Sequence, residues 1–131
     1  MTNFEFLKKH HSNLYGLIRE AEMNIFTDPD TSLYKLRKFG EEITNMIFVY
    51  EKIMSFNADS QYSNLQILEE ENILSQKELS QLHLIRINGN KSVHENINSA
   101  DIVKKTIKAA YNISTYFYKN YCNNHKRVIT S

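Results

Sequence analysis

Glycine and proline are scarce in this chain of 131 residues, which contains three glycines and one proline. The turns of a β-sandwich or β-barrel need many such residues, whereas helices joined by short polar loops need few. The scarcity therefore favours an all-α fold. A chain of this length fits one domain, and 41% hydrophobic with 24% charged residues is ordinary for a globular protein. We expect a single domain over residues 1–131.

The first half of the sequence predicts two helices. Apolar residues recur at helical spacing from Leu14 to Ile25, which predicts a helix that ends near Thr27. Asp28 then suits a helix N-cap, and Pro29 suits the first helical position, where an N–H is not required. The helix that follows is predicted to be long and central, and Gly40 would let a neighbouring helix approach closely. Its apolar face contains Leu33, Leu36, Gly40, Ile43, Ile47, Tyr50 and Met54.

The second half predicts one short helix and two longer ones. Residues 57–64 are polar and read as a loop before a short helix over 65–71. Ser75 and Glu78 have the spacing of a capping box, so a helix begins there. A last helix is expected from Ser99 to about Tyr121. These elements predict a compact antiparallel bundle of four main helices plus one short helix. The helix after the capping box would bury Leu79, Leu82 and Ile85.

Cysteine content and hydropathy indicate the cellular compartment of the protein. Cys122 is the only cysteine, so no internal disulfide can form, and no Cys/His spacing resembles a zinc site. The first residues lack the apolar core of a signal peptide, and no apolar run approaches the length of about 20 residues that spans a membrane. The sequence therefore predicts a cytoplasmic protein with no metal, no other cofactor and no membrane contact.

Charge is distributed unevenly, although the net charge is only +1. Residues 41–80 are acidic, whereas Asp101 is the only acid in residues 100–131. The basic residues of that last segment form either a face for a phosphate backbone or the solvated surface of the bundle. On the first interpretation Lys104, Lys105 and Lys108 contact nucleic acid. The segment also contains Lys119, Lys126 and Arg127.

Aromatic residues surround the last predicted helix. Because residues on all sides of a helix cannot face one core, some are expected to be exposed or to pack against a second subunit. This pattern predicts a homodimer. The rings could instead stack on bases, but burial in the core or in a dimer interface is the competing interpretation. The rings belong to Tyr111, Tyr116, Phe117, Tyr118 and Tyr121.

The stretch RINGNKSVHE, residues 86–95, is the candidate functional site. Arg86, Asn90 and His94 are four residues apart, so a continuous helix would align them in one polar row. Arg86 and His94 would then lie about 12 Å apart along the axis. That is too far for a hydrogen bond, so Asn90 or a bend at Gly89 would have to bring them together. The row is either a partly exposed polar stripe or a catalytic site.

Three stretches together carry a family resemblance: NFEFL at 3–7, DPDTSLYKLRKFGE at 28–41 and LHLIRINGNKSVHE at 82–95. They resemble a bacterial helical domain family that looks like a branch of the HEPN superfamily. Its members often sit at the N-terminus of type I restriction R subunits and related helicase-like proteins. The resemblance covers roughly residues 3–121 and implies an antiparallel bundle that commonly dimerises. It leaves open whether the chain is a stand-alone protein or the N-terminal domain of a longer one.

Active HEPN domains are metal-independent ribonucleases, and their motif contains an arginine, a polar residue and then a histidine. The resemblance implies that His94 would handle a proton and that an arginine would stabilise charge on the phosphate. Asn90 matches the polar position, but Gly89 stands where the active motif has arginine, and Arg86 one turn earlier could substitute. The resemblance also implies that Arg37 lines the same cleft, whereas spacing alone makes it a surface partner of Glu41.

Two functions of different classes follow. The first is a non-catalytic HEPN-like interaction and dimerisation module of a bacterial restriction or other defence system. It would contact RNA, DNA, or a partner helicase, translocase or restriction subunit. The second is a toxin-like, metal-independent endoribonuclease that uses Arg86 and His94. The sequence has no P-loop and no acidic nuclease cluster, so ATP hydrolysis or DNA cutting would reside in another domain or subunit.

Overall fold

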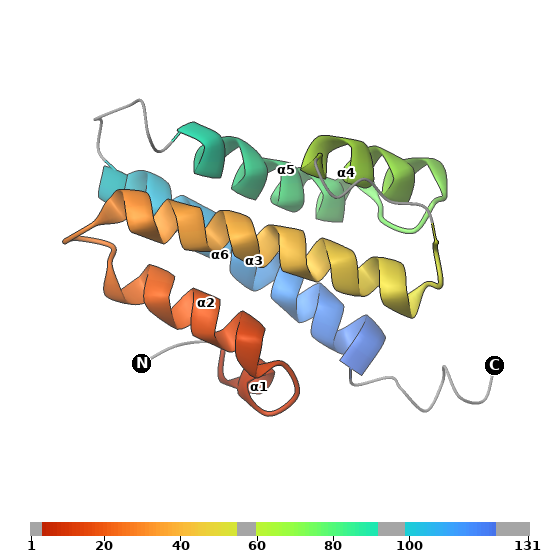
Figure 1. Ribbon diagram of the computed structural model, residues 1–131, viewed down its shortest axis with the longest axis horizontal. Helices are drawn as coiled ribbons and strands as arrows, with labels where there is room; N and C mark the ends of the chain where they lie inside the picture. The colour runs from red at the N-terminus through yellow and green to blue at the C-terminus, as the bar shows by residue number, and fades with distance from the viewer. Residues whose placement is uncertain (1–3, 55–59, 92–98, 123–131) are drawn as a thin grey trace.

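The computed structural model describes residues 4–54, 60–91 and 99–122 (Figure 1). Over these ranges the chain forms α-helices and one π-helical turn and contains no strand, so the predicted all-α class is confirmed. The helices are α1 (Glu5–Lys8), α2 (Ser12–Met23), α3 (Pro29–Tyr50), α4 (Gln61–Glu70), α5 (Gln76–Lys91) and α6 (Ser99–Phe117), and the π-helical turn is η1 (Tyr118–Cys122).

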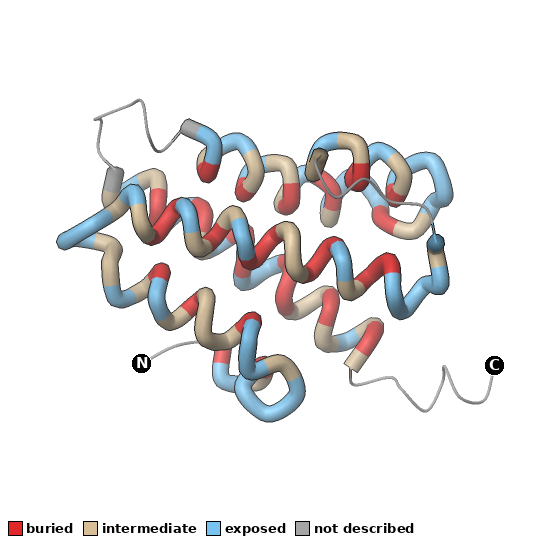
Figure 2. Tube along the Cα trace, in the orientation of Figure 1, coloured by how far each residue is buried: buried red, intermediate tan, exposed pale blue. Residues whose placement is uncertain are grey.

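The four long helices α2, α3, α5 and α6 run alternately in opposite directions (Figure 1). α3 is the central helix, as predicted, because it packs against α2, α5 and α6. The short helix α4 packs on α5, and α1 packs on α2. Buried positions recur along the inward sides of these helices (Figure 2). One continuous core therefore holds the bundle together.

α3 begins where Asp28 and Pro29 predict. The Asp28 carboxylate accepts the Thr31 backbone N–H at 3.2 Å, and Pro29 is the first helical residue. The predicted apolar face is buried from Leu33 to Ile47. It is not buried at Tyr50 and Met54, which are 41% and 91% exposed. The helix ends at Tyr50, and Lys52, with a left-handed φ of 59°, follows in the turn after it.

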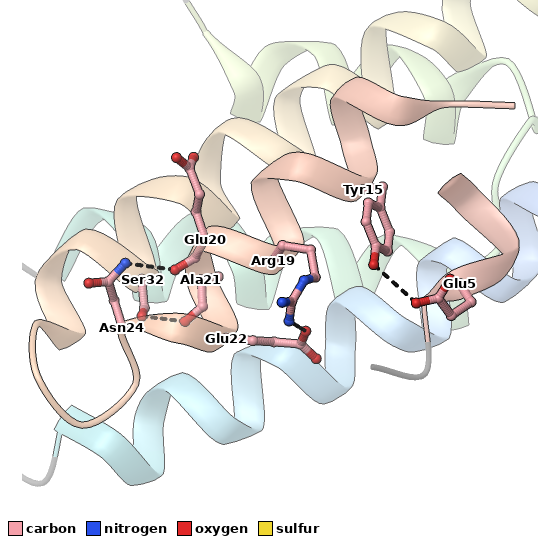
Figure 3. Close-up of polar contacts among 8 residues, drawn as sticks. All are labelled: Glu5, Tyr15, Arg19, Glu20, Ala21, Glu22, Asn24 and Ser32. Atoms are coloured by element: carbon pink, nitrogen blue, oxygen red, sulfur yellow. Dashed lines mark hydrogen bonds and ion pairs between the residues drawn. The ribbon is translucent and has the colours of Figure 1, made fainter. Parts of the chain in front are cut away.

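A buried hydrogen bond joins α2 to α3. The Ser32 hydroxyl, on α3, donates to the Ala21 carbonyl, on α2, at 2.6 Å (Figure 3). A hydroxyl can lie in this core because its hydrogen bond is satisfied there. α2 ends at Met23 and not near Thr27, so the predicted boundary was wrong. The residues between the two helices form a short turn.

The boundaries around α4 also differ from the prediction. α4 begins at Gln61, inside the stretch predicted to be a loop. The Ser60 hydroxyl accepts the Ser63 N–H at 3.1 Å and so caps a helix whose first turn is polar. At the start of α5, the Glu78 carboxylate accepts the Ser75 N–H at 3.2 Å, one of the two bonds of the predicted capping box.

The predicted helices begin at Leu14, but the one-turn helix α1 precedes them. Four residues are too few for a periodic pattern. Phe4 and Leu7 are nevertheless buried, and the Phe4 ring meets the Tyr111 ring edge-on at 5.6 Å between centroids. Phe117 and Tyr121 are also buried. Much of the aromatic surface of the last helix is therefore covered from within the chain.

Candidate functional site

α3 and α5 approach closely at two glycines. A Cβ added at Gly40 would lie 3.1 Å from Ile85 Cγ2, as expected for close approach, and one added at Gly89 would lie 2.7 Å from Arg37 Cβ. The helix is not interrupted at Gly89, where a bend was one of two ways to bring Arg86 and His94 together. α5 continues through this residue to Lys91, and its φ is not in the left-handed region. Gly89 instead leaves room for the Arg37 side chain.

Arg37 is therefore the basic residue that lies beside the RINGN part of the motif. Its Cζ is 5.5 Å from the Tyr34 ring centroid, and its Nη1 is 4.0 Å from the Glu41 carboxylate. Arg37 and Glu41 are 36% and 40% exposed, so solvent leaves this pair little stabilising energy. The predicted surface pairing with Glu41 is observed. The other interpretation, that Arg37 lines one cleft with His94, involves a residue outside the described ones.

Arg86 is directed toward α4 and toward the preceding turn of α5. Its Nε donates to His83 Nδ1 at 3.3 Å, and its Cζ lies 5.2 Å from the Tyr62 ring centroid. Burial, and secondly the Arg86 guanidinium, lower the pKa of His83, so this imidazole is neutral at pH 7 and can accept the bond. Arg86 would have to leave these contacts to reach a phosphate beside Asn90, one turn further along.

Asn90 is exposed at the end of α5, and His94 lies outside the described residues. The amide that the fold does use is Asn88, which sequence reasoning missed. Its Nδ2 donates to Thr106 Oγ1 at 2.9 Å and ties α5 to α6. The sequence offered no signal for this contact, because the Thr106 hydroxyl also donates to the Ile102 carbonyl at 2.7 Å and so has a partner within its own helix.

Lys104, Lys105 and Lys108 are exposed on α6. Among the residues that the structure describes, none of the three is in an ion pair with an acid. Lys104 Nζ lies 5.0 Å from the ring centroid of Phe26, an exposed residue that sequence reasoning also missed. Lys126 and Arg127 lie outside the described residues.

His11 and Cys122 form a second pair that the sequence did not reveal. His11 Nε2 lies 3.2 Å from Cys122 Sγ, across 111 positions of the chain. Burial raises the pKa of the Cys122 thiol. Burial, and secondly His10, lower the pKa of His11. Both groups are therefore neutral at pH 7, and their contact joins the segment between α1 and α2 to η1.

Over the described ranges, no group of three or more His, Cys, Asp or Glu side chains is arranged to hold a metal ion. In the same part of the chain, no helix combines the length and apolarity needed to cross a membrane.

The chain is similar to a restriction enzyme subunit. It is 29% identical over 118 residues to the type I restriction enzyme EcoKI endonuclease subunit of Escherichia coli (strain K12). The match covers 90% of this chain and 10% of the E. coli subunit, so the chain spans about a tenth of the length of that relative. No family model and no solved structure matches the chain. The similarity fits a restriction-related helical domain.

Proposed function

We propose that residues 1–131 form a non-catalytic, HEPN-like interaction domain of a bacterial restriction or related defence system. The observation that carries the proposal is the similarity to the E. coli endonuclease subunit, which extends over 90% of this chain and so is not confined to one motif. The domain would contact another restriction subunit, a helicase-type partner or nucleic acid. It would supply binding, and catalysis would reside in other parts of the assembly.

The surroundings of the motif favour binding over catalysis. General acid–base cleavage of a phosphodiester needs a proton-transfer group and a cation that converge on one phosphate. The Arg86 guanidinium is held by His83 and Tyr62, one turn before Asn90. Gly89 stands at the position where active HEPN domains have arginine. The Arg37 side chain occupies the space into which a side chain at this position would extend.

Incubation of the purified chain with RNA in EDTA separates this proposal from the ribonuclease alternative. An interaction domain leaves the RNA intact. Metal-independent cleavage that is lost in both Arg86→Ala and His94→Ala, but retained in the exposed control Lys77→Ala, would replace the proposal with a ribonuclease. Arg37→Ala belongs in the same series, because Arg37 is the cation beside Gly89.

Association is tested with the tagged chain in its own host cells. We expect a restriction or helicase-type subunit to co-purify in constant ratio, and recovery of the chain without such a subunit would contradict the proposal. The predicted homodimer is tested by light scattering during gel filtration. A mass of 15.4 kDa at all concentrations would remove dimerisation from the proposal.

A further inference from the structure

Phe26 is the most exposed aromatic residue of the described part of the chain. Its relative exposure is 75%, and it lies in the turn between α2 and α3; Met23, the last residue of α2, is 67% exposed. Full burial of a phenylalanine side chain is favourable by about 1.5–3 kcal/mol, so such rings usually pack in a core or an interface. The ring of Phe26 is instead held at the surface with one face near Lys104 Nζ.

Exposed lysines on α6 form a basic surface that begins beside the Phe26 ring. Lys104 and Lys108 are one helical turn apart, about 6 Å along the axis, and share a side of the helix. Lys105 is exposed as well. Asp101 is the only acid of α6. No described acid lies within ion-pairing distance of the three ammonium groups, and these are the charges that the surface would present to an anionic partner.

We propose that Phe26, Lys104 and Lys108 form a binding site for single-stranded nucleic acid. An unpaired base would stack on the Phe26 ring, and the adjoining phosphates would bind the two lysines. A duplex hides the faces of its bases, so the ring makes the site selective for single strands. The inference rests on the proposed function only for the class of ligand. It adds the strand form that is bound and a residue that recognises it.

The test is fluorescence anisotropy with labelled oligonucleotides of about 12 nucleotides, as single-stranded RNA, single-stranded DNA and the matching DNA duplex. Titrations between about 50 and 200 mM salt give the number of phosphate contacts. We expect single strands to bind more tightly than the duplex. The RNA and DNA arms show which sugar the site accepts.

Variants separate stacking from charge. Phe26→Leu keeps an apolar side chain without a ring, and should weaken single-strand binding by roughly 5- to 100-fold while duplex binding stays the same. Phe26→Tyr keeps an aromatic ring and should bind single strands about as tightly as the wild type. Lys104→Ala and Lys108→Ala should each weaken binding to both forms and reduce the salt slope by about 1. Met54→Ala and Lys77→Ala, exposed at other sites, are the matched controls.

Three results would overturn the inference: no binding at the lowest salt, unchanged single-strand affinity in Phe26→Leu, or duplex binding as tight as single-strand binding. Competition by polyglutamate as strong as by an unlabelled oligonucleotide would also overturn it, in favour of an acidic protein partner. Because Phe26 and both lysines are exposed, their variants should keep the wild-type melting temperature. If the oligonucleotide titrations overturn the inference, the co-purification result for the proposed function is unaffected. The inference and the proposed function can therefore fail separately.

Discussion

Replacing Gly89 with alanine tests how closely α5 packs on α3. The new Cβ would lie 2.7 Å from Cβ, 3.1 Å from Cγ and 3.3 Å from Cδ of Arg37. The Cγ and Cδ atoms can move by rotation of the arginine side chain. The Cβ atom cannot, because it is fixed to the backbone of α3. The two helices must therefore move apart locally to accept one methyl group.

Two opposing effects determine how Gly89→Ala changes the free energy of unfolding. Alanine is favoured over glycine inside a helix by about 1 kcal/mol. Overpacking a close contact costs about 1–3 kcal/mol. Gly16, within α2, provides the matched control, because a Cβ added there meets nothing within 4 Å. Gly16→Ala should therefore gain the helix propensity without the steric cost. The difference between the two variants isolates that cost, and we expect Gly89→Ala to be less stable than Gly16→Ala by about 1–3 kcal/mol.

Urea and thermal denaturation, followed by the helical circular dichroism signal, measure this difference. For a domain of this size, 1 kcal/mol changes the melting temperature by about 3–5 °C. A Gly89→Ala variant as stable as Gly16→Ala would refute the close contact between the helices. Combining Gly89→Ala with Arg37→Gly removes the opposing Cβ. The pair should then show a favourable coupling energy in a double-mutant cycle.

Asp28→Ala removes the cap of α3 and should lower the unfolding free energy by about 0.5–2 kcal/mol in urea denaturation, whereas Asp28→Asn should keep most of it. Ser32→Ala loses the buried bond to α2 and should cost about 1 kcal/mol, measured in the same way. The folded-state pKa of His83 is lowered, first by burial and then by Arg86. Its contribution to the unfolding free energy is therefore fully present above the unfolded pKa of about 6.5. This contribution is lost as the pH falls through the folded-state pKa. The His83 NMR titration should accordingly have its midpoint below that of an exposed histidine, and Arg86→Ala should raise the midpoint; no change on removing Arg86 would exclude its electrostatic effect. Cys122 is partly buried and its thiol pKa is raised by burial, so it should react more slowly with an aromatic disulfide reagent at neutral pH than in urea, and equal rates would contradict the partial burial.

The central helix could be predicted from the sequence because several local signals agree there. Asp28 and Pro29 define its start, and the apolar spacing from Leu33 to Ile47 defines its buried face. The spacing continues to Met54, but the helix does not. A periodic pattern indicates which side of a helix is apolar and contains no information about where the backbone turns. The left-handed φ of Lys52 has no sequence signal as strong as a glycine.

The candidate site was harder to predict because its contacts join segments distant in sequence. Gly89 suggested a bend when α5 was considered alone, and only the neighbouring α3 reveals that it makes room for Arg37. Arg86 pairs with His83 within its own helix, but its contact with Tyr62 depends on how α4 packs. Phe26 reads as an ordinary apolar residue, and its exposure follows from the turn in which it lies. Tertiary packing decides each of these cases.

The contact between the start and the end of the fold affects how the protein forms during synthesis. α2 and α3 can pair as soon as residue 50 has left the ribosome. The partners of Phe4 and His11 are made much later, because Tyr111 and Cys122 are among the last described residues. Until then the early helices leave an apolar surface open to chaperones or to other nascent chains. The first helical hairpin can therefore form early, whereas completion of the core must wait until Cys122 has been translated.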